Sequence, residues 1–248
     1  MNKKTMNTLI KCTVALGLVG SVANAVADTV NPYNYSVFKN ALNDAKWQRG
    51  LDSEKQCAST DCESTLDSSS NQQYIWADDA TNTMYFSTNG SQASKWRSEL
   101  RFEENFSRGS TRTFTAKIAY WANRSTSDGF TVAQLHMETG GAYDVKGPPA
   151  RLEIIDENTY EVQWRNSYSC SDDCWSADEF STSTSGWKDI QLKTSGDYIN
   201  VSVAGQTFSY NLKGDDKNWP SDGGYFWKTG IYIQDEGTAY TGYQNIYW

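Results

Sequence analysis

The chain has 248 residues, with 30 acidic against 22 basic side chains and a single histidine. This length suits one β-rich domain with a sizeable core. The formal charge of −8 argues against nucleic acid as the main partner. It does not exclude an anionic ligand, because a local basic cleft can oppose the charge of the whole molecule.

The first 25 residues have the features of a secretory signal peptide. Three lysines lie near the start, the run Cys12–Val22 is apolar or small, and residues 23–25 fit the small-x-small cleavage pattern, as residues 25–27 also do. The apolar run is too short for the alternative, a transmembrane anchor. We therefore predict a signal peptide over 1–25 and a mature chain over 26–248. The mature chain is expected to be secreted, to periplasm or medium, without membrane association.

Removal of the signal peptide takes away three lysines and no acid, which makes the formal charge of −8 more negative by three, to −11. It leaves four cysteines in two close pairs, Cys57/Cys62 and Cys170/Cys174. In an exported chain such pairs predict local disulfides. The alternative, a metal site, needs tighter cysteine pairs or more histidines. We predict no metal and no cofactor.

The first predicted element of the mature chain is a helix over Ser36–Gln48, whose apolar residues recur at helical spacing. Ser36 or Asn34 is a candidate cap. Residues 52–73 are polar and are predicted to form a loop that holds the first cysteine pair.

The rest of the chain has the pattern of short strands joined by polar turns. The predicted strands lie at Thr83–Ser87, Trp96–Phe102, Thr111–Trp121, Phe130–Met137, Arg151–Ile155, Thr159–Arg165, Trp187–Thr194, Tyr198–Val203, Gln206–Leu212, Tyr225–Gln234 and Gln244–Trp248. Residues 166–186 form a long polar connection, of a kind that often carries function. No repeat and no linker divides the mature chain, so we predict one all-β domain.

Three of these strands combine one polar face with one apolar face, because successive side chains of a strand point to opposite sides. The predicted polar faces are Arg97, Glu99 and Arg101; Val132, Gln134 and His136; and Lys228, Gly230, Tyr232 and Gln234. Each strand alone fits the ordinary solvent-exposed face of an antiparallel sheet. Arginine, glutamine, histidine and tyrosine are, however, the types that bind carboxylates and move protons. If the three strands share a sheet, they form a basic groove suited to an anionic chain.

Aromatic residues between these strands allow two readings. Trp121, Tyr143 and Trp164 are candidates for stacking on sugar rings. Each of them alone fits core filling better.

The three segments, in this order, resemble the alginate lyases of polysaccharide lyase family 7 and the closely related family 18. The family signatures R-[ST]-E-[LV]-R, Q-[IV]-H and Y-F-K-A-G-[VI]-Y-N-Q correspond here to residues 97–101, 134–136 and 226–234. The chain departs from them at Leu135, at Ile233 and at Phe226-Trp227. The middle residue of Q-x-H is linked in the family to mannuronate or guluronate preference, so Leu135 leaves that preference open. The resemblance spans roughly the whole mature chain.

The resemblance implies a β-jelly roll of two antiparallel sheets with a concave cleft, and β-elimination of a 1,4-linked uronate polymer. The C5 proton of a uronate becomes acidic once its carboxylate is neutralised. By similarity, Arg97 and Gln134 neutralise the carboxylate and stabilise the developing charge. Tyr232 is the implied acid, and His136 or Tyr232 the base, depending on the face of the sugar that carries the proton.

The remaining residues of the motifs are implied to bind substrate. They are Glu99, which would also orient the arginines, and Arg101, Lys228 and Gln234, which would hold neighbouring sugars. The expected partner is alginate, an anionic polysaccharide, and the expected state is a monomer that cleaves within the chain.

Two other functions remain open. A jelly-roll glycoside hydrolase needs two carboxylates across the bond that it cuts. Residues 153–157 offer a similar motif, but Asp156 is predicted to point away from Glu153 and Glu157. A non-catalytic sugar-binding module is the second alternative, and it needs no matched acid and base.

Overall fold

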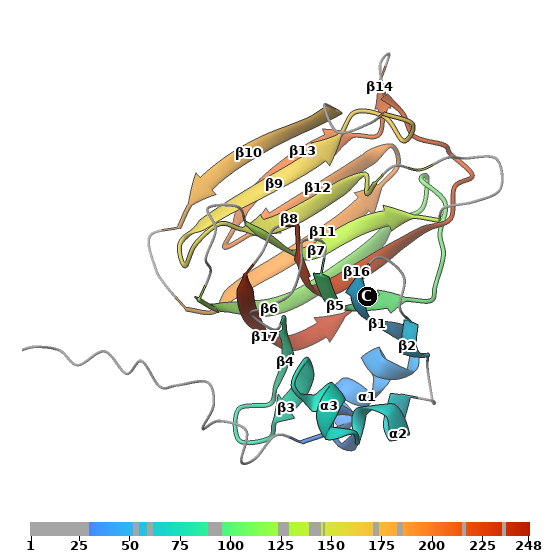
Figure 1. The fold of residues 1–248 in the computed structure, drawn as a ribbon. Helices are drawn as coiled ribbons and strands as arrows, with labels where there is room; N and C mark the ends of the chain where they lie inside the picture. Colours follow the sequence, from blue (N-terminus) through green and yellow to red (C-terminus); the bar gives the residue numbers. More distant parts are fainter. Residues whose placement is uncertain are drawn as a thin grey trace, which may run out of the picture.

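The computed structural model describes residues 30–51, 55–58, 62–88, 96–123, 129–138, 145, 147–170, 174–182, 186–214, 217–234 and 237–248. In these residues two large antiparallel sheets lie face to face (Figure 1). The front sheet has the order β10 (Trp175–Ser181), β9 (Thr159–Arg165), β8 (Ala150–Ile154), β7 (Phe130–Met137), β16 (Tyr225–Ile233), β5 (Trp96–Phe102), β1 (Ala45–Leu51) and β2 (Lys55–Ala58). The back sheet has the order β13 (Gln206–Asn211), β12 (Tyr198–Val203), β11 (Lys188–Ser195), β6 (Arg112–Asn123), β17 (Thr238–Tyr247), β4 (Thr83–Ser87) and β3 (Ile75–Asp78).

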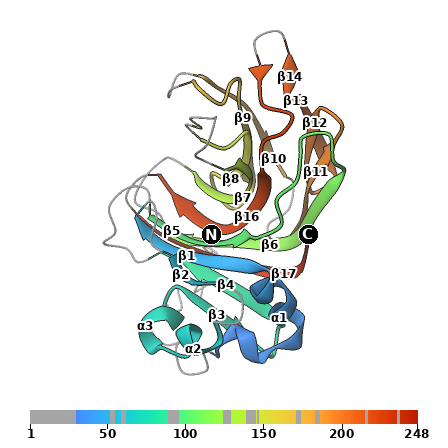
Figure 2. The ribbon, with the colours of Figure 1, turned by 90° about the vertical axis from the view of Figure 1, so that its right-hand side faces the viewer.

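Smaller elements complete the described fold. The helical ones are η2 (Pro32–Asn34), α1 (Ser36–Asn43), α2 (Cys62–Leu66) and α3 (Ser69–Gln72), and β14 (Lys213–Gly214) pairs with β15 (Lys217–Asn218). Figure 2 shows the front sheet curling from β1 and β5 through β16 and β7 to β8 and β9, with the helices gathered beside β3 and β4.

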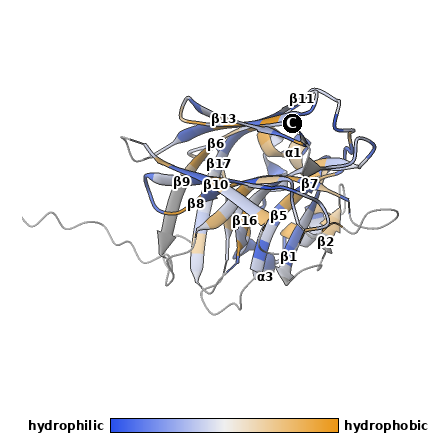
Figure 3. Ribbon diagram, turned by 90° about the horizontal axis from the view of Figure 1, so that it is seen from above, coloured by the Kyte–Doolittle hydropathy of each residue, from blue (hydrophilic) through white to orange (hydrophobic). Residues whose placement is uncertain are grey.

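The core lies between the two sheets. Leu100, Leu135 and Ile231 of the front sheet are buried in one cluster with Phe114 and Leu192 of the back sheet. Since side chains alternate along a strand, their neighbours on β5, β7 and β16 face away from the core. Figure 3 shows hydrophobic segments in both sheets and hydrophilic segments along the edges. The polar side chains of the front sheet therefore lie on the face that is turned away from the core.

Most predicted strands are confirmed. Those at 83–87, 96–102, 130–137, 159–165 and 198–203 coincide with β4, β5, β7, β9 and β12. Others differ by one or two residues at their ends, whereas β17 begins at Thr238, well before the predicted start at Gln244. The alternation of polar and apolar residues and the positions of the turns were thus enough to predict an all-β architecture.

The helix prediction is wrong in its second half. The helix α1 ends at Asn43, its N-cap is Tyr35 without a side-chain cap, and Ala45–Leu51 forms β1, which pairs with all of β5. Pairing with the central strand β5 determines the structure of these residues, although the spacing of their apolar side chains also fits a helix. The predicted loop 52–73 instead contains β2, α2 and α3, and the predicted connection 166–186 contains the edge strand β10.

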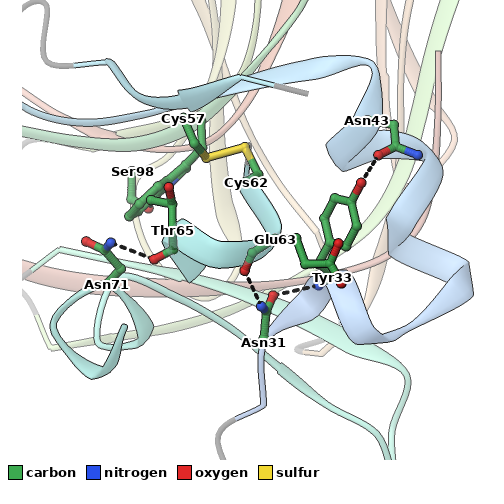
Figure 4. The surroundings of a disulfide bond; sticks show 10 residues. Asn31, Tyr33, Asn43, Cys57, Cys62, Glu63, Thr65, Asn71 and Ser98 are labelled. Carbon is green, nitrogen blue, oxygen red and sulfur yellow. Dashed lines mark hydrogen bonds between the residues drawn. A yellow bond between two sulfur atoms is a disulfide. The ribbon is translucent and has the colours of Figure 1, made fainter. Parts of the chain in front are cut away.

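Both predicted disulfides are present, Cys57–Cys62 and Cys170–Cys174. The first joins β2 to α2 (Figure 4). Near it, the Asn31 side chain donates to the Glu63 carbonyl at 2.8 Å and accepts from the Tyr33 backbone N–H at 2.9 Å, which ties the helical segments to the start of the described chain.

Several predictions fall on residues outside this description. They concern the signal peptide over 1–25, the Trp121 side chain and Tyr143. In the described part of the chain, no helix is both long and apolar enough to cross a bilayer. No group of three or more metal-ligating side chains is found there either.

Candidate active site

A cleft of about 390 Å³ opens on the polar face of the front sheet. Its lining comes from β1, β5, β7, β16 and the residue after β7: Gln48, Arg97, Arg101, His136, Met137, Glu138, Phe226 and Lys228. Three of these side chains are cations that the sequence placed on polar strand faces. The acidic protein therefore carries a local basic cleft.

Strand register explains why these groups meet. Arg101 pairs with Lys228, and Lys228 pairs in turn with Gln134, so three strands place these residues in one row. Arg97 pairs with Tyr232 in a second row. Directly paired side chains on one face lie within contact distance of each other.

Glu99 does not line the cleft itself but is buried beside Arg97 and Lys228, which do. It is 1% exposed. Its Oε1 accepts from Gln134 Nε2 at 2.6 Å, and its Oε2 accepts from Lys228 Nζ at 3.0 Å and lies 3.7 Å from Arg97 Nη1. A carboxylate can only accept, so it orients the Gln134 amide with an N–H group toward Glu99. Glu99 is thus placed to position the other residues, as the sequence suggested for the arginines.

Burial lowers the pKa of Lys228, and the Glu99 carboxylate opposes that shift. Arg97 and Arg101 lower it further, because like charges disfavour a third cation nearby. The buried Lys228–Glu99 pair is therefore a coupled unit, in which loss of either partner leaves a charge without its neighbour.

Aromatic rings hold both arginines in place. The Arg97 guanidinium lies 4.8 Å from the centre of the Tyr232 ring, and that of Arg101 lies 4.0 Å from the centre of the Phe226 ring. Phe226 also stacks on His136, with ring centres 5.2 Å apart. We did not predict Phe226 as a site residue. The signal for it was available, because Phe226 lies two positions before Lys228 and so on the same face of the strand.

The predicted polar face of β7 is partly wrong. The register between β7 and its neighbours shifts around Val132: Tyr232 pairs with Thr131, although Thr229 pairs with Ala133. This irregularity reverses the alternation. Thr131 lies on the polar face and donates to Glu153 Oε1 at 2.9 Å, whereas Val132 is buried in the core.

Gly230 and a tyrosine of the back sheet support this irregularity. Gly230 has φ +133°, and a Cβ there would lie 2.3 Å from the Ser98 carbonyl oxygen, so no other residue fits. The Tyr243 hydroxyl accepts from Gly230 N at 3.3 Å and lies 2.7 Å from the carbonyl oxygens of Gly230 and Val132. These contacts set the backbone from which Tyr232 projects.

His136 is partly exposed on the wall of the cleft. Its pKa is lowered from 6.5 to about 3, first by burial and then by Lys228, Arg97 and Arg101. The ring is therefore neutral near pH 7. Its Nδ1 lies 2.8 Å from the Met137 carbonyl oxygen and, in the other tautomer, accepts from the Met137 backbone N–H at 2.9 Å. When Nδ1 donates to the carbonyl, Nε2 carries the lone pair.

Gln234 lies outside this cleft. It follows the end of β16, and its Oε1 accepts from Arg151 Nη2 at 3.2 Å. Arg151 belongs to a second polar cluster on β8 and β9, in which its Nε lies 3.0 Å from Glu153 Oε1 and 2.6 Å from Gln163 Oε1. Tyr232 and Gln134 do not line the cleft directly, but they contact Arg97 and Glu99. Trp164 stacks on Tyr210, which fits the core-filling reading.

Comparison with known proteins identifies the family. The family model described as "Alginate lyase" matches residues 46–248. The chain belongs to the alginate lyase family. It is accordingly an enzyme, a polysaccharide lyase. No curated protein sequence matches the chain.

Solved structures show the same fold. Alginate lyase A1-II', a member of polysaccharide lyase family 7, has a TM-score of 0.68 at 19% identity, with 84% of this chain and 96% of that chain covered. Alginate lyase AlyC3 has a TM-score of 0.71 at 15% identity, with 88% and 94% covered. The lyase AlyA1 from Zobellia galactanivorans has a TM-score of 0.60 at 17% identity, with 87% and 98% covered. The predicted β-jelly roll is confirmed.

Proposed function

We propose that this lyase cleaves alginate within the chain by β-elimination, using the cleft on the front sheet. The observation that carries the proposal is the group of Arg97, Arg101 and Lys228 around one cleft beside a neutral histidine. Each sugar of a polyuronate brings one carboxylate, so rows of cations and amides match its repeating charge.

In this proposal, Arg97 and Gln134 neutralise the carboxylate of the sugar that loses its C5 proton. Glu99 supports both roles from below, because it takes one N–H of the Gln134 amide and lies beside the Arg97 guanidinium. The second N–H of the amide is then available to the substrate. Donors held in advance stabilise the enolate-like charge without reorganising during the reaction.

His136 and Tyr232 supply the proton transfers. Tyr232 is the acid that protonates the departing O4, and the base is His136 or Tyr232, according to which face of the sugar carries the C5 proton. A neutral His136 with its proton on Nδ1 accepts the C5 proton at Nε2. A bound carboxylate offsets the charge of the nearby cations, which raises the pKa of His136 from its low value in the free enzyme.

The relatives support this assignment by what they bind. Alginate lyase A1-II' was crystallised with a substrate written GGMG in a variant that replaces one histidine and one tyrosine. A structure of alginate lyase AlyC3 shows it in complex with dimannuronate. Lys228 and Arg101 line the cleft and are proposed to hold neighbouring sugars, whereas Gln234 would need to leave Arg151 to do so.

The residues that suggested a glycoside hydrolase, 153–157, do not form the carboxylate pair that this reaction needs. Asp156 Oδ1 accepts from the backbone N–H groups of Asn158 and Thr159 in the β8–β9 turn, while Glu153 lies buried on β8. These carboxylates do not face each other across the cleft, so we do not propose hydrolysis.

The test is incubation of the purified protein with polymannuronate, polyguluronate and other polyuronates. We expect ultraviolet absorption from unsaturated ends, and early products of mixed length if cleavage is internal. Binding without any unsaturated product would contradict the proposal, and products confined to one small size would contradict internal cleavage.

Secretion is a separate proposal. It is supported by the signal-like residues 1–25 and by the two disulfides, which persist in oxidising compartments. N-terminal sequencing of protein recovered from the periplasm and the medium tests it, with a start at residue 26 or 28 expected.

A further inference from the structure

Glu138 is a carboxylate on the wall of a cleft that is proposed to bind carboxylates. It directly follows β7, and its backbone N–H donates to the Gly224 carbonyl at 2.9 Å. Its Oε1 accepts from Arg101 Nη2 and from Asn105 Nδ2, both at 2.8 Å. Glu138 therefore neutralises one of the three cations of the cleft in the free protein.

The cations of the cleft differ in how firmly their carboxylate partners are held. Lys228 and Arg97 lie beside Glu99, whose side chain is 2% exposed. Arg101 pairs with Glu138, whose side chain is 51% exposed. An exposed ion pair contributes little to stability, so a competing ligand can replace one of its partners at small cost. Breaking a buried ion pair leaves an uncompensated charge and costs much more. Among the three, the partner of Arg101 is the one that a ligand can displace.

The position of Arg101 makes this competition direct. Its guanidinium lies over the Phe226 ring at 4.0 Å, which occupies one face of the plane. Carboxylates bind a guanidinium through the N–H groups at its edge. One of these N–H groups now donates to Glu138. A substrate carboxylate that binds Arg101 must therefore compete with Glu138 for this N–H group. It is also repelled by the negative charge of the Glu138 carboxylate.

We propose that Glu138 is an affinity-determining residue of the cleft: its carboxylate occupies Arg101 in the free enzyme and must yield this cation to a carboxylate of the polymer. The proposal rests on the proposed function, because it assumes a polyuronate in this cleft. Glu138 sets substrate affinity and its dependence on salt, and takes no part in the proton transfers.

The test is the Glu138→Gln variant. The amide oxygen still accepts from Arg101 and Asn105, so the geometry is kept while the charge is removed. We expect KM for polymannuronate to fall about three- to tenfold at low ionic strength, with a much smaller change in kcat. The difference from the wild type should shrink with added NaCl, because salt screens charges that are exposed to solvent.

Glu104→Gln is the matched control. Glu104 Oε1 lies 2.8 Å from Arg112 Nη2, and Glu138 Oε1 lies at the same distance from Arg101 Nη2. The Glu104 and Glu138 side chains are both exposed. Glu104 does not line the cleft. The control removes the same charge at a nearby site, so KM should remain at the wild-type value.

The proposal is wrong if KM of Glu138→Gln equals that of the control, or if it rises, since a rise means that the charge of Glu138 helps Arg101 to bind substrate. If the wild type produces no unsaturated ends from any polyuronate, the proposed function fails instead. Retardation in native gels that contain polymannuronate then compares the variants without turnover. Stronger retardation of Glu138→Gln than of the wild type supports the proposal, and equal or weaker retardation overturns it.

Discussion

The two halves of the front sheet use the same residue types to different ends. In the cleft half, on β5, β16 and β7, Arg97 and Lys228 lie beside the buried carboxylate Glu99, and Arg101 pairs with Glu138 on the wall of the cleft. In the other half, on β8 and β9, Arg151 is 5% exposed and lies among Glu153, Gln163 and Gln234. The first arrangement leaves positive charge for a ligand, and the second satisfies its charge internally.

The two halves show that a candidate binding site is distinguished by an excess of positive over negative charge, and not by the presence of charged residues alone. Arg151 also lies 4.4 Å from the centre of the Trp175 ring, which covers it further. Loss of either partner of such a buried pair leaves a charge without its neighbour. Residue type alone would have ranked Arg151 beside Arg97 as a candidate for binding carboxylates.

The largest expected effect concerns proton transfer in the cleft half. Tyr232→Phe should lower kcat roughly 100- to 1,000-fold, because the phenol is the proposed acid and its loss leaves the departing O4 without a proton donor. Release of unsaturated ends under saturating substrate measures it.

Tyr160→Phe is the control in the other half. Tyr160 lies in the core, and its hydroxyl is buried without a hydrogen-bond partner among the described residues. Loss of this hydroxyl should leave kcat near the wild-type value. A fully active Tyr232→Phe variant would refute the assignment of the acid.

The next largest effects concern stability and activity when one buried carboxylate of each half is replaced. Glu99→Gln and Glu153→Gln should each lower the free energy of unfolding, by about 3 kcal/mol or somewhat more, because each leaves a buried cation without its partner. Glu99→Gln should also lower kcat/KM at least about tenfold, since Gln134 and Arg97 lose their support. Denaturant unfolding and steady-state kinetics measure the two quantities.

The two halves of the sheet are distinguished by the activity of these two variants and not by their stability. Glu153→Gln should lose stability but keep kcat/KM within a few fold. If both variants lose activity in proportion to stability, Glu99 has no special role in positioning the site residues.

The smallest expected effect concerns pH. The pKa of His136 in the folded protein, about 3, lies below its value of 6.5 outside the fold. Between these values the unfolded chain binds a proton that the folded chain does not, so stability is complete above about pH 6.5 and falls as the pH decreases toward 3. Because the ring is partly exposed, we expect a loss of about 1 kcal/mol between pH 7 and pH 5, less than the full shift implies.

His136→Gln removes this titration while the carboxylates remain. The free energy of unfolding of the variant should therefore depend less steeply on pH than that of the wild type over this interval. Parallel curves would show that His136 titrates normally in the folded enzyme.

The sequence by itself determined the class of the fold, the disulfide pairs and most of the cleft. Alternation along β5 and β16 placed Arg97, Glu99, Arg101, Lys228 and Tyr232 on one face, because side-chain direction in a regular strand is a local property. Motif order added Gln134 and His136 and indicated the family. The close spacing of the cysteines was enough to pair them.

Tertiary structure decided what local pattern does not encode. The register shift at Val132 exchanged the faces of Val132 and Thr131. Pairing with β5 made a strand of Ala45–Leu51, of which residues 45–48 were predicted to be helical. The tertiary structure also decided that Arg101 is neutralised, since its partner Glu138 follows β7, whereas Glu153, the carboxylate beside Arg151, lies on the same strand. Contacts between distant segments set charge balance, and for that reason the role of Glu138 became visible only in the folded chain.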